Sequence, residues 1–121
     1  MNTVVVRGLL SSEPKRRTLP SGDEVIAYEV TTATPDGRVS VPAAWFAPTR
    51  AASLAAGDAV VVVGLVRRRF FRGSGGVVSR TEVVADTVAR AGSARARAAV
   101  DRAIAGVAAA LDEPFAADDA A

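Results

Sequence analysis

The chain has 121 residues with 15 basic and 13 acidic side chains, and 50% of its residues are hydrophobic but only 5% aromatic. It contains no cysteine, which excludes disulfides, thiol nucleophiles and thiolate metal sites, and no histidine, the commonest general base and metal ligand. A zinc enzyme, a Ser-His-Asp hydrolase and a redox disulfide protein are therefore excluded, and neither a metal nor a cofactor is expected.

Short β-type segments separated by turn signals fill the chain as far as residue 88. Strands are expected at residues 3–7, 25–32, 39–46, 59–66 and 77–86. Residues 11–22 carry Pro14, Pro20 and Gly22 and are predicted to form a loop. Pro42 favours an edge position or a bulge in the third strand.

Two connections complete the predicted domain. The Ala-rich residues 50–56 predict about two turns of helix that end at Gly57, and residues 73–76 (Gly-Ser-Gly-Gly) predict a hairpin tip. Five strands with one short helix between the third and fourth predict an all-β fold, a five-stranded Greek-key barrel of the OB type. A five-stranded sandwich stays open as an alternative.

The composition changes after residue 89. Ser93 can cap a helix, and Val100, Ile104, Val107 and Leu111 fall on one helical stripe that needs a partner surface. Pro114 ends this amphipathic helix, and a disordered acidic tail is expected after it. The predicted organisation is a domain over residues 1–90 and a C-terminal helix with a short tail over residues 91–121.

The positive charge is concentrated in the predicted domain. Residues 1–92 carry 12 basic and 8 acidic side chains, whereas residues 93–121 carry 3 and 5. A basic body suits a polyanionic partner, because cations neutralise phosphates and release counterions. A solvated surface with scattered charge is the alternative. The longest apolar run, residues 59–63, is too short to cross a bilayer and no signal peptide is evident, so a cytoplasmic protein is expected.

A basic and aromatic cluster occupies the expected fourth strand and its return. Alternation along the strand divides it into two faces, with Arg67, Arg69 and Phe71 on one and Arg68, Phe70 and Arg72 on the other. Arg80 follows the glycine tip. Guanidinium groups that contact phosphates beside a ring that stacks on a base are typical of single-stranded nucleic-acid binding. The alternative is a hairpin whose arginines protect an exposed edge.

Trp45 and Phe46 form a second aromatic pair at the end of the third strand. Alternation directs one ring into the core and one outward, and the sequence leaves open which one is exposed. No catalytic group stands out, because the carboxylate pairs Asp23-Glu24 and Asp118-Asp119 are merely adjacent and the glycine tip lacks the features of a phosphate loop. An enzyme is not expected.

The ordered set of motifs over residues 1–90 resembles the bacterial single-stranded DNA-binding protein family, of which the chain would be a short member or paralogue. The elements that carry the resemblance are Met1-Asn2-Thr3-Val4 with Gly8, Glu13-Pro14 with Arg17, Pro20-Ser21-Gly22, residues 25–32 with Tyr28, residues 54–58 (Leu-Ala-Ala-Gly-Asp) with the run that follows, Arg67-x-Arg69-x-Phe71, and residues 81–86.

The resemblance implies an OB-fold that binds single-stranded DNA with little sequence preference and protects it in replication, recombination and repair. It also implies a homo-oligomer, either a tetramer or a dimer, associated with the nucleoid. Carried over by position, Phe71 would stack on a base, Arg67 and Arg69 would contact phosphates, and Phe46 or Trp45 would supply a second ring. Arg72 and Arg80 belong to the same basic cluster, and Arg17 lies at a further basic position of the family.

The chain also departs from the family pattern. Ser40 stands where the family has an aromatic residue, the loop at residues 34–37 lacks a further ring, and the Gly/Pro/Gln-rich linker is missing. The acidic tip that contacts replication and repair proteins has only a faint counterpart in residues 112–115 (Asp-Glu-Pro-Phe). An interaction or assembly module that has lost most DNA binding is therefore the alternative function.

Overall fold

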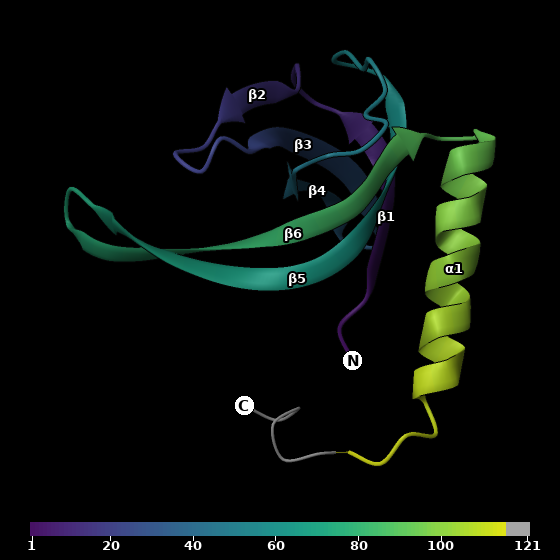
Figure 1. Ribbon diagram of the computed structural model, residues 1–121. Coiled ribbons are helices and arrows are strands. Elements are labelled where there is room, and N and C mark those ends of the chain that lie inside the picture. The colour runs from purple at the N-terminus through teal and green to yellow at the C-terminus, as the bar shows by residue number, and fades with distance from the viewer. Residues whose placement is uncertain (116–121) are drawn as a thin grey trace.

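The computed structural model describes residues 1–115, which form one curled sheet and one helix (Figure 1). The elements are β1 (Val4–Leu10), β2 (Lys15–Thr18), β3 (Glu24–Thr34), β4 (Gly37–Phe46), β5 (Ala59–Gly73), β6 (Gly76–Arg90) and α1 (Ala94–Ala110). The sheet has the order β1-β5-β6-β4-β3-β2, and β1 also pairs with β3, so five strands close on themselves and β2 lies at the outer edge. The β4–β6 contact is parallel, and the other pairings are antiparallel.

An aliphatic core fills the inside of this ring. The run Val60–Val63 in β5 is buried on both faces, as its β-branched composition predicts. Val60 and Val62 point into the ring with Trp45 and Tyr28, whereas Val61 and Val63 belong to a second cluster beneath α1. One strand therefore supplies both apolar layers of the molecule.

The prediction of a loop over residues 11–22 is wrong, because β2 lies within it. Lys15 to Thr18 pair with Ala27 to Glu24 of β3, directly after Pro14. All four residues of β2 are exposed and none is a large apolar residue. An edge strand of this kind has no apolar alternation by which a sequence pattern could detect it.

The short helix predicted for residues 50–56 is also absent from the structure. Its backbone donors bond elsewhere: the Ala55 N–H donates to Asp58 Oδ2 (2.9 Å), the Ala56 N–H to Glu13 Oε1 (3.1 Å) and the Gly57 N–H to the Leu10 carbonyl (2.7 Å). A seven-residue helix is costly to nucleate. Two side chains and a neighbouring strand therefore accept the backbone hydrogen bonds of this Ala-rich segment, which adopts an irregular conformation.

The C-terminal helix forms where it was predicted, but the face that packs only overlaps the predicted stripe. Ser93 is the N-cap, and its Oγ accepts a hydrogen bond from the Ala96 N–H at 3.1 Å. Ala96 and Ala99 are buried against Val61, Val63 and Ala89, whereas Ile104 is 61% exposed and Leu111 66%. The expected stripe is thus confirmed only in part: Val100 packs against this cluster, whereas Ile104 and Leu111 do not. The small alanines beside the stripe form the centre of the docking face, because they allow the helix to approach the sheet closely.

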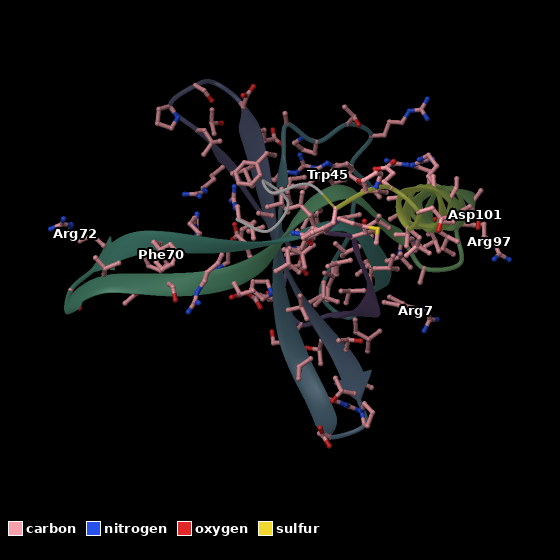
Figure 2. The ribbon with its side chains drawn as sticks, turned by 90° about the horizontal axis from the view of Figure 1, so that it is seen from below. Arg7, Trp45, Phe70, Arg72, Arg97 and Asp101 are labelled. Carbon is pink, nitrogen blue, oxygen red and sulfur yellow. The ribbon has the colours of Figure 1, made fainter. Side chains whose placement is uncertain are left out.

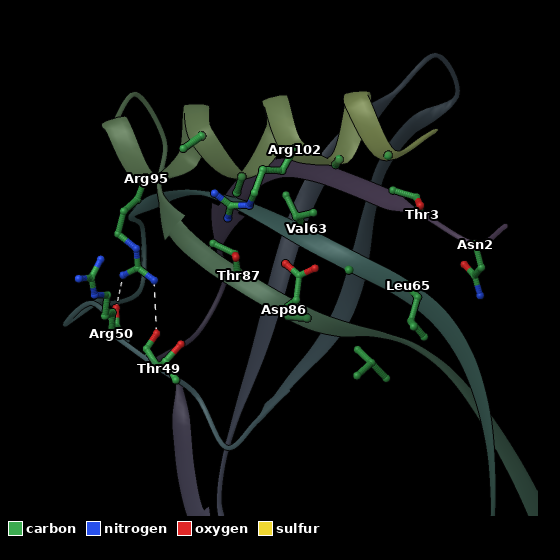
Figure 3. A pocket seen from close by; sticks show the side chains of 17 residues that line it. Asn2, Thr3, Thr49, Arg50, Val63, Leu65, Asp86, Thr87, Arg95 and Arg102 are labelled. Carbon is green, nitrogen blue, oxygen red and sulfur yellow. Dashed lines mark hydrogen bonds between the residues drawn. The ribbon is translucent and has the colours of Figure 1, made fainter. Parts of the chain in front are cut away.

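A cleft of about 800 Å³ lies beside this contact, between α1 and the strands β5 and β6 (Figure 3). Arg95 closes one end, where its guanidinium donates to the carbonyls of Thr49 and Arg50 and so ties the helix to the irregular loop. Within residues 1–115, no helix is long and apolar enough to cross a membrane. The tail predicted to be disordered lies mostly in residues 116–121, outside the described residues.

Candidate nucleic-acid interface

The outer halves of β5 and β6 form a long two-stranded arm, defined here as residues 67–82. Its pairing runs from Arg67 opposite Glu82 to Gly73 opposite Gly76, which confirms the predicted hairpin tip. The arm projects well beyond the ring of strands, with Phe70 along its length and Arg72 near its end (Figure 2). Arg72 is therefore remote from the ring, and any contact it makes would be at the arm's tip.

A groove of about 320 Å³ lies where the base of the arm meets β2, β3 and β4. Five of its lining residues are cations and three are acids: Lys15, Arg16, Arg17, Arg69 and Arg80, with Glu13, Glu29 and Glu82. Phe46 and Tyr28 also line it. The structure thus brings three of the predicted arginines and one predicted ring to a single concave surface.

Two of the arm's arginines share one buried carboxylate. Glu82 is only 6% exposed, and its Oε2 accepts a hydrogen bond from Arg67 Nη2 at 2.7 Å, while its Oε1 lies 3.9 Å from Arg69 Nη2. The Nε atoms of Arg67 and Arg69 are buried without a hydrogen-bond partner within the described chain. Cross-strand pairing of Arg67 with Glu82 fixes the acid in this position.

The arginines also cover the aromatic rings. The guanidinium carbon of Arg67 lies 5.3 Å from the centre of the Phe46 ring, and that of Arg69 lies 5.6 Å from the Phe71 ring. On the other face of the arm, Arg68 lies 5.6 Å from the Phe70 ring. These contacts follow the alternation expected from the sequence, and each is within cation–π distance.

The structure decides which of the two adjacent rings faces the groove. Trp45 is 4% exposed and belongs to the core, so the alternative in which it supplies the second stacking ring is wrong. Phe46, the next residue of β4, is directed to the groove, where Arg67 covers it. A tryptophan inside the core cannot reach a ligand without opening the ring of strands.

The remaining predicted cations differ in their surroundings. Arg80 Nη2 donates to Glu29 Oε1 at 2.8 Å, and both side chains are partly exposed. Arg17 lines the groove on β2 and makes no ion pair within residues 1–115. Sequence reasoning did not single out Lys15, Glu29 or Glu82, although the register of the hairpin would have placed Glu82 opposite Arg67.

Tyr28 forms part of the groove floor and of the core. Burial raises the pKa of its hydroxyl above the usual value of 10.0, and the nearby Arg16 lowers it by a smaller amount. The phenol therefore stays neutral through the physiological range. Its ring is 3% exposed and serves as a wall of the groove, with no face free for stacking.

Comparisons with known proteins show the fold. Neither a family model nor a curated protein matches the sequence. Among solved structures, a deletion mutant of the single-stranded DNA binding protein from Thermus aquaticus is similar, with a TM-score of 0.61 and 22% identity. The match covers 74% of this chain and 40% of that protein, so the chain spans less than half the length of its structural neighbour. The arrangement of strands is consistent with the OB-type fold expected from the sequence.

Proposed function

We propose that the chain binds single-stranded DNA with little sequence preference in the groove and protects it during replication, recombination and repair. The observation that carries the proposal is the convergence of Arg17, Arg69 and Arg80 beside the Phe46 ring. Guanidinium groups can take successive phosphates while a ring stacks on a base, and each stacked base contributes about 1–3 kcal/mol. The similarity of the fold to a single-stranded DNA binding protein supports the same function.

The surface favours a single strand over a duplex. Aromatic faces can stack only on bases that are already unpaired, and a duplex hides those faces. A duplex reader commonly inserts a helix into the major groove, whereas the cations of this groove lie on strands. The proposed protein is a cytoplasmic binding protein without catalytic activity.

The first test is fluorescence anisotropy of a labelled oligo-dT of about 35 nucleotides at two salt concentrations, beside the matching duplex and oligo-U. We expect saturable binding to the single strand that weakens as salt rises, and far weaker binding to the duplex. Comparison with oligo-U measures the preference for DNA, because both single strands offer a backbone and base faces. No binding to any single strand at low salt and micromolar protein would contradict the proposal.

Self-association and protein partners form the second part of the proposal. We expect a homo-oligomer, either a tetramer or a dimer, and its mass can be measured by light scattering after gel filtration. Residues 112–115 are exposed in the structure, as a contact for replication or repair proteins requires. A monomer at all accessible concentrations would contradict the oligomer.

An interaction module is the second candidate function. Ile104 of α1 and Leu111, its C-cap residue, are exposed apolar side chains, and with Val5 of β1 they line a shallow apolar seam. Absence of DNA binding together with self-association or capture of a partner through this seam would favour the module. Substitution of Ile104 by Ser would then abolish association and leave the fold intact.

A further inference from the structure

We infer that Glu82 and Glu29 act as internal counter-ions of the groove, which hold its arginines in the free protein and lower its affinity for a polyanion. The inference rests on the proposed function, because it concerns how tightly the same groove binds a single strand. It assigns a role to two acids on a surface whose ligand would be anionic. The two acids have different surroundings and so give two separate tests.

The position of Glu82 is the stronger observation. A carboxylate that is 94% removed from solvent would be costly to bury alone, but here it lies between Arg67 and Arg69. Glu82 brings one negative charge to two guanidinium groups, so a phosphate that approaches either of them meets a cation whose charge is already balanced in part. The phosphate must therefore share or displace the carboxylate, which reduces the free energy gained from the contact.

Arg67 links this ion pair to the stacking ring. The same guanidinium that Glu82 holds at 2.7 Å lies over the Phe46 ring at 5.3 Å. A base that stacks on this face of Phe46 has to move Arg67 away, and Glu82 opposes that movement. Release of Arg67 would expose both a cation and a ring to the strand.

Glu29 plays the same part on the other side of the groove. Its Oε1 accepts a hydrogen bond from Arg80 at 2.8 Å and its Oε2 from the Ser40 hydroxyl at 2.9 Å. Ser40 therefore orients an acid toward a groove arginine, at the position where the resembled family has a ring. Both members of the Glu29–Arg80 pair are partly exposed, so solvent screens their interaction and its effect is expected to be smaller than that of Glu82.

Counterion release gives a signature that a purely structural role would not show. A single strand releases its condensed cations when a protein charge neutralises its phosphates, and an arginine whose charge a carboxylate balances neutralises a phosphate only in part. The slope of log affinity against log salt for a single strand is about 0.7 per neutralised phosphate. Removal of the Glu82 charge should therefore steepen the slope as well as raise the affinity.

The experiment compares Glu82→Gln, Glu29→Gln and Asp101→Asn with the unaltered protein in titrations of the same labelled oligo-dT across a salt series. Glutamine keeps an acceptor for Arg67 and removes only the charge. We expect Glu82→Gln to bind about fivefold more tightly at low salt with a slope steeper by about one, and Glu29→Gln about twofold more tightly. Asp101 is exposed on α1, away from the arm (Figure 2), so its substitution makes the same charge change outside the groove.

The outcomes separate this inference from the proposed function. Binding by the unaltered protein, with unchanged or weaker binding by both glutamine variants, would overturn the inference and leave the function standing. An equal gain from Asp101→Asn would overturn it too, because net charge would then suffice. Loss of folding in Glu82→Gln, checked by circular dichroism, leaves the exposed Glu29→Gln to decide. Failure of every form to bind would overturn the function and the inference together.

Discussion

The two halves of β5 lie in opposite environments although they belong to one strand. Val60–Val63 are all buried and contribute to both apolar clusters, whereas most side chains between Arg67 and Arg72 are exposed on the arm. β6 shows the same division, with Val83, Ala85 and Val88 in the core. The inner half thus supplies the packing that stabilises the fold, and the outer half is left free for the proposed contact with a ligand. Substitutions in the two halves should therefore have separable effects.

The largest expected effect is a loss of stability caused by a substitution in the inner half of β5. A Cβ added at Gly64 would lie 2.1 Å from the carbonyl oxygen of Val84, at the bulge where the β5–β6 register shifts. Gly64→Ala should therefore destabilise the protein by about 3 kcal/mol, measured by urea unfolding. At the arm's tip, a Cβ on Gly75 meets nothing within 4 Å, so Gly75→Ala should change stability by less than about 0.5 kcal/mol. Equal destabilisation by both variants would contradict the division.

The next effect distinguishes the two faces of the arm. Phe71→Ala removes the ring beside Arg69 and should weaken binding to oligo-dT by about 1–3 kcal/mol. Phe70→Ala is the matched control, because Phe70 is the adjacent exposed ring on the opposite face. Its expected effect on affinity is small, and both variants should unfold at the same urea concentration as the unaltered protein. A greater loss from Phe70→Ala would place the nucleic-acid surface on the other face.

A smaller effect concerns α1, which covers the inner half. Ser93→Ala removes the acceptor for the Ala96 N–H and should destabilise the chain by about 1 kcal/mol in thermal or urea unfolding. Ser93→Asp keeps a capping oxygen and should restore most of that loss. Neither variant should change the affinity for a single strand, since the cap lies outside the groove. A fall in affinity at full stability would show that α1 contributes to binding.

The smallest expected effect is a dependence of stability on alkaline pH. Burial holds the pKa of Tyr28 above 10.0 in the folded chain, so above that pH the unfolded chain releases its proton first. The contribution of the neutral phenol is complete below pH 10 and is lost as pH rises through the folded pKa. The free energy of unfolding should be lower at pH 11 than at pH 9, and this difference should be smaller in Tyr28→Phe. An equal fall in Tyr28→Phe would assign the effect to other groups.

Much of the fold could be predicted because the spacing of apolar residues and the positions of turn residues determine the structure of the segments that contain them. The Val-rich run of β5 and the glycines of the hairpin tip have few alternative structures, and both were found. The four residues of the edge strand β2 are all polar and exposed, so no apolar period could reveal it. The false helix at residues 50–56 had good propensity, but Asp58 and Glu13 bond its backbone in another form. Helix propensity takes no account of hydrogen bonds that a segment makes to side chains outside it.

The candidate site was predictable in its cations and less so in its acids. Arg17, Arg69 and Arg80 meet in one groove, as a shared binding role requires, and Phe46 joins them. Glu82 escaped notice because it lies fifteen positions from Arg67, although the hairpin tip sets the two opposite each other. The depth of its burial depends on the packing of three strands. That packing could not be seen before the fold was known.

The most direct test of the account replaces two cations in the groove and, in a second protein, two cations outside it. Arg69 and Arg80 line the groove, whereas Arg7 and Arg97 point away from the arm (Figure 2). Both double alanine variants lose the same charge. For Arg69→Ala with Arg80→Ala, we expect at least about a tenfold loss of affinity for oligo-dT and a salt slope lower by about one. Arg7→Ala with Arg97→Ala should bind nearly as the unaltered protein does. Equal losses in the two variants would contradict the claim that the groove is the binding surface.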